Sequence, residues 1–308
     1  MKNISKSLFF SFLTIAIWGL TSCEKKINPE LQSADPILVV DAWLTNKVGS
    51  QTIALTKTQS YFDNTLPPPV SGAIVSITDN NGKVFPFNEE PANSGKYVWK
   101  PIANEVFGTI GNSYTLNIQL QGEVYQSSTK MGRSPEIDSL TIKKNESTQI
   151  NPDFYRAQFY ARDFVGRGDA YWIRAIKNSV LLNKPADINV AYDAGFSAGG
   201  SFDGITFIPP IRGRINPNDK DANDKAVSPY VPGDSVYVEI HSITVDAFNY
   251  LQQVSIQTNR PGGFAELFAR PIANVPTNIV NTNAQGKPAV GFFNVSAVTG
   301  KGKRFPKK

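Results

Sequence analysis

Cysteine and histidine are almost absent, because the 308-residue sequence contains one of each. A lone cysteine cannot form an internal disulfide, and two such residues are too few for a zinc site of the usual cysteine and histidine type. The sequence also lacks a Walker loop, a dinucleotide-binding fingerprint and a kinase motif. We therefore predict that the protein has no resident metal and no cofactor.

Long apolar runs are also scarce, and the one that stands out is residues 8–20 (LFFSFLTIAIWGL). It is too short to cross a bilayer, which takes about 20 residues. Lys2 and Lys6 precede the run, and the tetrapeptide LTSC at residues 20–23 ends it. A basic start, an apolar stretch and a small-residue cleavage site are typical of a secretory signal peptide, which we place at residues 1–22.

The single cysteine lies at this cleavage point. The LTSC segment resembles the bacterial lipobox, in which the cysteine is acylated through its sulfur and becomes the first residue of the mature chain. We therefore expect lipidation at Cys23 and a polar, lipidated tether over residues 23–35. The alternative is an ordinary signal peptide followed by a chance cysteine. With lipidation, a lipid bilayer is the first expected partner.

Positive charge is concentrated at the ends of the chain. Loss of the two lysines in the leader lowers the formal net charge from +5 to +3. The last eight residues hold five of the remaining basic residues, so the body without them carries about −2. We predict a solvated basic tail over residues 301–308. Nucleic-acid binding is not expected, because it requires basic residues clustered on a folded surface.

Short strands fill the first part of the mature chain. In residues 113–120 (SYTLNIQL), for example, Tyr114, Leu116 and Ile118 fall on one face. About seven strands in about 95 residues, separated by Gly, Asn and Asp turns, predict an immunoglobulin-like β-sandwich over residues 36–133. The candidate strands are residues 37–44, 51–56, 73–78, 84–87, 96–100, 113–120 and 123–128.

A second β-rich domain is expected over residues 134–300. One amphipathic helix is predicted near residues 245–258, because Thr244 can cap it and Asp246 suits the positive end of the helix dipole. We therefore predict a mainly β protein of two domains, with one helix in the second. The candidate strands of the second domain are residues 139–143, 155–162, 171–182, 204–208, 235–243 and 289–298.

One segment matches a catalytic motif. Residues 195–199 (GFSAG) fit the G-x-S-x-G nucleophile elbow, with Ser197 as nucleophile and His241 as base. The elbow requires a strand that turns sharply into a helix, and the next residues, GSFDG, are poor helix formers. We therefore favour a chance match and predict no catalytic residue. A glycosidase-type carboxylate pair stays open, because sequence does not give the distance between two carboxylates.

Two long irregular segments, residues 193–204 and 215–231, are the first candidates for a binding surface, because long loops in compact domains are often functional. Residues 219–224 begin like an EF-hand loop, but the central glycine is missing and Tyr230 replaces the final glutamate. A solvated acidic loop is therefore favoured over a calcium site. The candidate binding residues are Phe196, Ser197, Phe202, Asp203, Asp219, Asp221, Asn223, Asp224 and Tyr230.

Three tryptophans follow the leader, Trp43, Trp99 and Trp172, and each lies in an expected strand. Core packing is the default interpretation, and stacking on a sugar or peptide is the alternative. Ser139 and Ser235 each lie in an Asp-Ser-aliphatic triplet. The triplet resembles the O-glycosylation motif of Bacteroidetes, so both serines are candidate glycosylation sites.

Several segments together resemble one family. They include PILVVDAWLT, SYFDNTLPPPVSGAIVSITDNNG, SGKYVWK and NSYTLNIQLQGEVYQSST in the first half, and VYVEIHSITVDAFNYLQQVSIQ, ARPIANVPTNI and AVGFFNVSAV in the second. They are similar to the Bacteroidetes lipoproteins grouped as domain-of-unknown-function family 4249. The resemblance implies an outer-membrane location and frequent gene neighbourhood with TonB-dependent transporters, and it carries no catalytic residues.

Three functional hypotheses follow. The favoured one is an outer-membrane lipoprotein, on the periplasmic or cell-surface face, that serves as an accessory or ligand-binding subunit of a TonB-dependent nutrient uptake system. Its ligand would be a small molecule, a glycan or a peptide. The second is an adhesion or structural protein of the envelope, and like the first it is not an enzyme. The third is a surface serine hydrolase.

Overall fold

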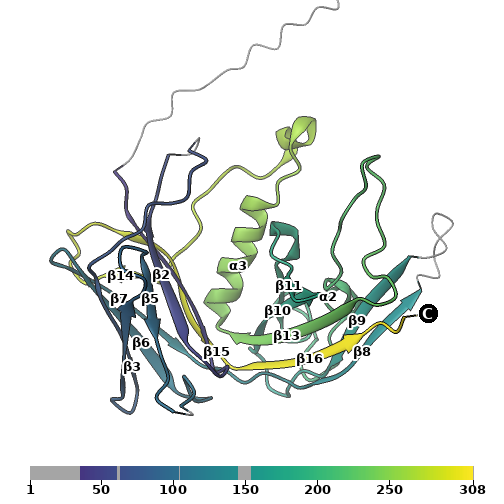
Figure 1. The fold of residues 1–308 in the computed structure, drawn as a ribbon, viewed down its shortest axis with the longest axis horizontal. Helices are drawn as coiled ribbons and strands as arrows, with labels where there is room; N and C mark the ends of the chain where they lie inside the picture. Colours follow the sequence, from purple (N-terminus) through teal and green to yellow (C-terminus); the bar gives the residue numbers. More distant parts are fainter. Residues whose placement is uncertain (1–34, 61–62, 104, 145–153, 308) are drawn as a thin grey trace, which may run out of the picture. The chain divides into compact units, whose positions relative to one another are not determined.

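The computed structural model describes residues 35–60, 63–103, 105–144 and 154–307, and most of their regular structure is β-strand (Figure 1). The mainly β prediction is therefore confirmed. Within these ranges, no helix is long and apolar enough to cross a membrane.

Nine strands form the larger sheet, in the order β14-β7-β6-β3-β4-β5-β2-β1-β15. Alternate side chains of these strands meet in one hydrophobic core, as the pattern of buried residues in β1 and β6 shows. The strands are β1 (Leu38–Thr45), β2 (Gln51–Lys57), β3 (Ile74–Asp79), β4 (Val84–Glu89), β5 (Lys96–Trp99), β6 (Ser113–Leu120), β7 (Glu123–Lys130), β14 (Val280–Asn281) and β15 (Ala289–Ser296).

This sheet bends around its core until its two ends approach each other. Asn278, just before β14, donates to the carbonyl of Phe293 in β15 and accepts from its amide, at 2.8 and 2.9 Å. Strand β4 pairs with β3 on one side and with β5 on the other, so the pairing is continuous. The strands thus form a large, nearly closed sheet, and the expected immunoglobulin-like sandwich is not specifically confirmed.

Strand β15 comes late in the chain but completes the first sheet. It pairs in parallel with the whole of β1, from Leu38 opposite Ala289 to Thr45 opposite Ser296. Gly291 permits the close approach, because a Cβ there would lie 1.9 Å from a backbone oxygen of β1. The boundary expected near residue 133 therefore does not separate two independent sheets, and Pro36–Lys308 form one compact unit.

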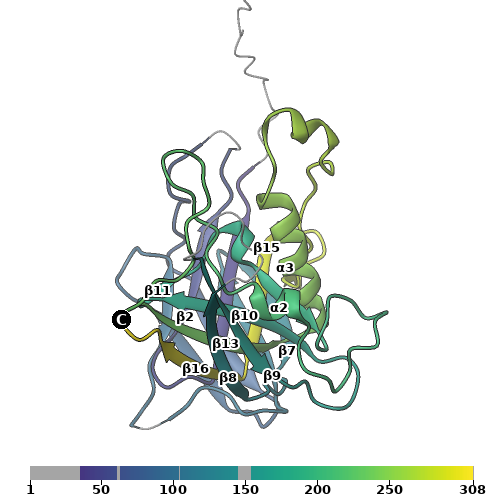
Figure 2. The ribbon, with the colours of Figure 1, turned by 90° about the vertical axis from the view of Figure 1, so that its right-hand side faces the viewer.

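The second half of the chain builds a five-stranded sheet and a two-stranded sheet. In the first, β10 (Ala170–Lys177) and β13 (Ser235–Ile243) are central neighbours, flanked by β11 (Val180–Leu181), β12 (Asn189–Tyr192) and β16 (Val298–Arg304). In the second, β8 (Ile137–Lys144) pairs with β9 (Tyr155–Ala161). Figure 2 shows these strands together, with the helix α3 beside them. A second hydrophobic core lies between the two sheets.

The expected basic tail is partly a strand. Residues 301–304 belong to β16, which pairs with β13 over its whole length. The ammonium of Lys301 donates to the carbonyls of Ile137 and Asp138, at 3.1 and 2.7 Å. Sequence pattern missed this strand because glycine and lysine alternate in it, whereas strands are usually recognised by apolar residues.

The predicted helix is present as α3 (Val245–Thr258). The hydroxyl of Thr244 accepts from the amide of Ala247 at 3.2 Å, which is the predicted cap. Ala247, Phe248 and Leu251 are buried against β10, β12 and β15, so the helix lies between the two large sheets. The shorter helices are η1 (Pro185–Asp187), α2 (Pro209–Gly213) and η2 (Gly263–Phe268).

Candidate binding cavity

The face of β1 that points away from the core carries Val39, Asp41 and Trp43. This follows from strand geometry, because successive side chains point to opposite faces and the residues between these three fill the core. On β10, the same alternation sends Tyr171 and Ile173 into the second core, and Trp172 and Arg174 to the other side. The free faces of β1 and β10 therefore turn toward the same space.

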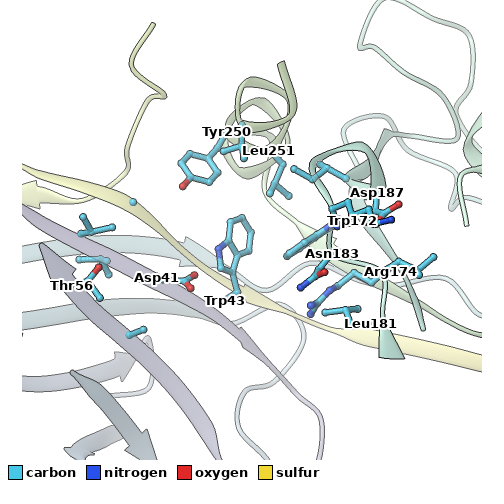
Figure 3. Close-up of a pocket in the computed structure, with 18 of the residues that line it drawn as sticks. Asp41, Trp43, Thr56, Trp172, Arg174, Leu181, Asn183, Asp187, Tyr250 and Leu251 are labelled. Carbon is cyan, nitrogen blue, oxygen red and sulfur yellow. Dashed lines mark hydrogen bonds between the residues drawn. The ribbon is translucent and has the colours of Figure 1, made fainter. Parts of the chain in front are cut away.

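A cavity of about 600 Å³ occupies this space (Figure 3). Strands β1, β2 and β10 supply its walls, Tyr250, Leu251 and Val254 of α3 close one side, and residues 181–188 close another. The volume is within the range of about 300–1,000 Å³ that is typical of small-molecule sites. Most of its lining residues belong to strands or to α3, and Pro67 and residues 182–184 add loop positions.

Aromatic rings line the centre of the cavity. Trp43 stacks on Phe292 with ring centroids 5.5 Å apart, and meets Trp172 edge-on at 5.2 Å. Tyr250 contacts both Trp43 and Phe292, at 6.0 and 4.7 Å. The four rings join strands β1, β10 and β15 to helix α3, and they fix the tryptophan side chains in place before any ligand arrives.

Two charged groups of opposite sign flank these rings. Figure 3 shows Asp41 on one side of Trp43 and Arg174 on the other. Among the described residues, neither side chain has a hydrogen bond or an ion pair, and the Arg174 guanidinium lies 4.7 Å from the Trp172 ring centroid. Desolvation raises the pKa of Asp41, although the charge of Arg174 opposes the shift. Desolvation likewise lowers the pKa of Arg174, against the opposing charges of Glu239 and Asp41.

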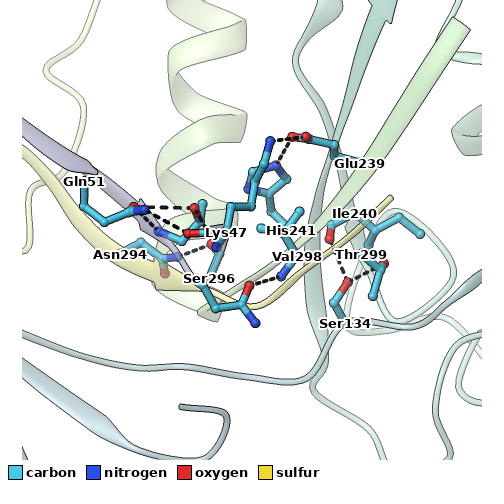
Figure 4. A network of polar contacts seen from close by, with 12 residues as sticks. Lys47, Gln51, Ser134, Glu239, Ile240, His241, Asn294, Ser296, Val298 and Thr299 are labelled. Atoms are coloured by element: carbon cyan, nitrogen blue, oxygen red, sulfur yellow. Dashed lines mark hydrogen bonds and ion pairs between the residues drawn. The ribbon is translucent and has the colours of Figure 1, made fainter. Parts of the chain in front are cut away.

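A fully paired polar network lies next to the cavity (Figure 4). Glu239 is the residue of β13 opposite Arg174, and it is only 3% exposed. It forms an ion pair with Lys47 and a 2.9 Å hydrogen bond with Nε2 of His241. Burial would raise the pKa of Glu239, but these two partners outweigh it and lower the pKa to about 2. Burial lowers the pKa of His241, so the imidazole is neutral at pH 7 and donates to Glu239.

The first predicted binding loop lies apart from this network. Phe196 and Ser197 are exposed in a turn after β12, while the ring of Phe202 packs over Gly195 and Gly200. The next helix, α2, begins only at Pro209, so the strand–serine–helix geometry of a nucleophile elbow is missing. His241 is buried and hydrogen-bonded to Glu239, and no hydrogen bond joins it to Ser197 among the described residues.

The second predicted loop is held together largely by its own side chains. Asp221 accepts from the amides of Asn223 and Lys225, and Asp224 pairs with Lys220 at 2.8 Å. Asp219 is different, because it pairs with Lys184 at the rim of the cavity at 2.5 Å. This loop therefore touches the cavity through one ion pair.

Tyr230 was predicted as a binding residue, and this prediction is wrong. Its side chain is fully buried, and its hydroxyl donates to the carbonyl of Ile215 at 2.7 Å. Desolvation raises its pKa, which keeps the phenol neutral. Tyr230 falls in a polar segment of the sequence, but its ring packs in the second hydrophobic core.

Three aspartates form the arrangement in the described ranges that could take a cation. One carboxylate oxygen from each of Asp163, Asp193 and Asp203 lies within 4.8 Å of the others. Each carboxylate already accepts a hydrogen bond: Asp163 from Tyr171 and Gly204, Asp193 from Gly168, and Asp203 from Gly166. Asp203, a predicted binding residue, thus ties two loops together.

The other predicted sites have no link to the cavity. Ser139 is exposed on β8, whereas the Ser235 amide donates to the side chain of Asn178 at 2.8 Å. Cys23 and the tether before residue 35 lie outside the described residues. Both serines and Cys23 therefore stay predictions.

Sequence reasoning missed most of the cavity, although a signal was present. Asp41 and Trp43 are two residues apart in β1, and Trp172 and Arg174 are two residues apart in β10. A charge and a tryptophan at a spacing of two fall on the same face of a strand. In otherwise apolar strands, this pattern marks a face that is not core.

The chain was compared with known proteins. No curated protein matches it. Residues 24–302 match the family described as a domain of unknown function, DUF4249, and the chain belongs to that family.

Proposed function

We propose that the protein is a lipid-anchored, ligand-binding accessory subunit of a TonB-dependent nutrient uptake system at the outer membrane. The cavity between β1, β10 and α3 carries the proposal, because it combines ligand-sized volume, fixed aromatic walls and two charged groups without a hydrogen bond or ion pair among the described residues. Such a combination of an apolar pocket and a few convergent polar groups is typical of ligand sites.

The leader and Cys23 support the envelope part of the proposal. An acylated cysteine followed by a polar tether would hold the folded domain close to a membrane, where an uptake partner is located. The transporter part rests on the gene neighbourhood that the family resemblance implies. A TonB-dependent transporter is accordingly the proposed protein partner.

Affinity purification tests this proposal. The full-length tagged protein, solubilised from native membranes, is expected to bring down a large β-barrel transporter. The matched control is Cys23→Ala, which removes the acylated sulfur and should lose both fatty-acid labelling and the membrane partner. Repeated recovery of the acylated protein alone would contradict the transporter proposal.

The serine hydrolase hypothesis receives no support from the site. Ser197 lies on an exposed turn, and His241 is buried and bonded to Glu239. A serine-reactive probe should therefore fail to label the protein, and labelling that is lost in Ser197→Ala would revive the hypothesis. An adhesive or structural role does not account for the cavity, and we do not propose it.

A further inference from the structure

We propose that the cavity binds a short peptide with a free amino end and a free carboxylate end. This inference rests on the proposed ligand-binding function and specifies its ligand. The structural basis is the placement of Asp41 and Arg174 on opposite sides of the Trp43 ring, both facing the cavity.

The carboxylate end is assigned to Arg174. Glu239, the acidic residue opposite it on β13, is already bonded to Lys47 and His241. Among the described residues, the Arg174 guanidinium has no hydrogen-bond acceptor, and it lies over the Trp172 ring, 4.7 Å from the centroid. A planar guanidinium presents its N–H groups as a fork, which suits two parallel hydrogen bonds to a carboxylate.

The amino end is assigned to Asp41. Its carboxylate lines the cavity and has no hydrogen bond or ion pair among the described residues, although the charge of Arg174 acts on it. A partly desolvated carboxylate without a hydrogen-bonded partner is unfavourable, and a bound ammonium would relieve that cost. The ligand would thus give each of the two charges the direct hydrogen-bonded partner that the described residues do not provide.

The space between the two charges suits a peptide body. Trp43, Trp172 and Tyr250 offer ring surfaces, and Leu251 and Val254 add aliphatic surface. A dianionic ligand such as a phosphate ester would be repelled by Asp41, and a neutral oligosaccharide would form no ion pair with either charge. A zwitterion with an apolar body satisfies all three features together.

Tryptophan fluorescence of the full-length protein in detergent micelles can test this, because Trp43 and Trp172 line the cavity. The probes are alanine and leucine peptides of two to four residues, each free, N-acetylated, C-amidated or blocked at both ends. The free peptides should bind, and each single block should weaken binding at least about tenfold, the value of a charged hydrogen bond of about 1.4 kcal/mol or more.

Variants then assign each end. In Arg174→Gln, C-amidation should have no further effect while N-acetylation should still weaken binding, and Asp41→Asn should show the reverse. Arg212→Gln is the matched control, because Arg212 also stacks on an aromatic ring, Tyr160 at 4.5 Å, but does not line the cavity. It should bind the free peptides as the unmodified protein does.

Two results would overturn the inference. If doubly blocked peptides or maltotriose bind as tightly as free peptides, and Trp43→Ala abolishes that binding, the cavity is a ligand site but not one for zwitterionic peptides. If no free peptide of two to four residues binds at millimolar concentration, the peptide assignment falls, while recovery of a transporter from membranes would still support the proposed function.

Discussion

Glu239 and Arg174 lie opposite each other on neighbouring strands, yet their charged groups differ in whether they have hydrogen-bonded partners. Glu239 is buried with two partners, Lys47 and His241. Arg174 and its neighbour across the cavity, Asp41, have no hydrogen-bond partner in the described ranges. Both situations arise within one pair of strands, so the difference is local and comes from what lies beyond each side chain.

This contrast separates structural charges from functional ones. A buried charge with its own partners fixes the packing of the elements that provide them, here the loop after β1 and strand β13. A charge that faces a cavity without a hydrogen-bonded partner is available to a ligand. We therefore expect the first group to govern stability and the second to govern binding.

The largest effect is expected for Glu239→Gln. Removing one charge of a buried, hydrogen-bonded set typically destabilises a protein by about 3–5 kcal/mol, and we expect the low end because Lys47 is half exposed. Urea unfolding at pH 7 measures the change. The matched variant Arg174→Gln should leave the urea unfolding midpoint nearly unchanged. A comparable loss of stability in both variants would contradict the distinction between structural and functional charges.

The lowered pKa of Glu239 also predicts that its contribution to stability depends on pH. The pKa of Glu239 falls from 4.5 in the unfolded chain to about 2 in the folded protein, so its contribution is complete above pH 4.5 and is lost as pH falls toward 2. The stability gap between the unmodified protein and Glu239→Gln should therefore shrink across this window, measured by urea unfolding at several pH values. A gap that stays constant would contradict the assigned role of Glu239.

A smaller effect should distinguish two tyrosines. The Tyr230 hydroxyl donates to a buried carbonyl, so Tyr230→Phe should lower the free energy of unfolding by about 1 kcal/mol. Tyr250 lines the cavity, and its hydroxyl has no hydrogen bond to any described residue. Tyr250→Phe should therefore leave thermal and urea midpoints unchanged. An equal loss in both would mean that the Tyr250 hydroxyl is also part of the packing.

The smallest expected effect is a gain in stability. Desolvation raises the pKa of Asp41, so ionisation of this carboxyl is less favourable in the folded protein than in the unfolded chain. Asp41→Asn should then raise the unfolding midpoint slightly at pH 7, and the gain should vanish as pH falls below 3.8, where the unfolded chain also becomes protonated. A lowered midpoint at pH 7 would show that Asp41 has a stabilising partner after all.

Local patterns in the sequence predicted the strands and the helix α3, because alternation and capping depend on neighbours a few residues away. The parallel pairing of β1 with β15 could not be predicted in this way, since it joins Leu38 to Ala289. For the same reason, the sheet predicted over residues 36–133 lacked β14 and β15, which lie at its two ends. Strand β16 was not predicted for a different reason, because its alternating glycine and lysine residues lack the apolar pattern by which strands are recognised.

Most of the candidate site was not predicted, because loop length in the sequence was taken as the signal for binding residues. Most of the predicted binding residues lie on exposed turns, and Tyr230 lies in the core. Trp43 and Trp172 were expected in strands and in the core: both lie in strands and pack, partly buried, against the hydrophobic cluster around α3, and both also line the cavity. The cavity exists because two sheets and a helix enclose a space, and that depends on tertiary arrangement. Only the spacing of Asp41 to Trp43 and of Trp172 to Arg174 pointed to it.

The parallel pairing of β1 with β15 also has a consequence for how the chain matures. A ribosome makes β1 about 250 residues before β15, so one edge of β1 stays without its partner through most of translation. Long-range pairing of this kind is slow, and a chain that cannot finish folding early remains threadable. If residues 1–22 act as the export leader that the sequence predicts, late closure is an advantage: the nascent protein can pass a translocon as an extended chain and fold once it has emerged.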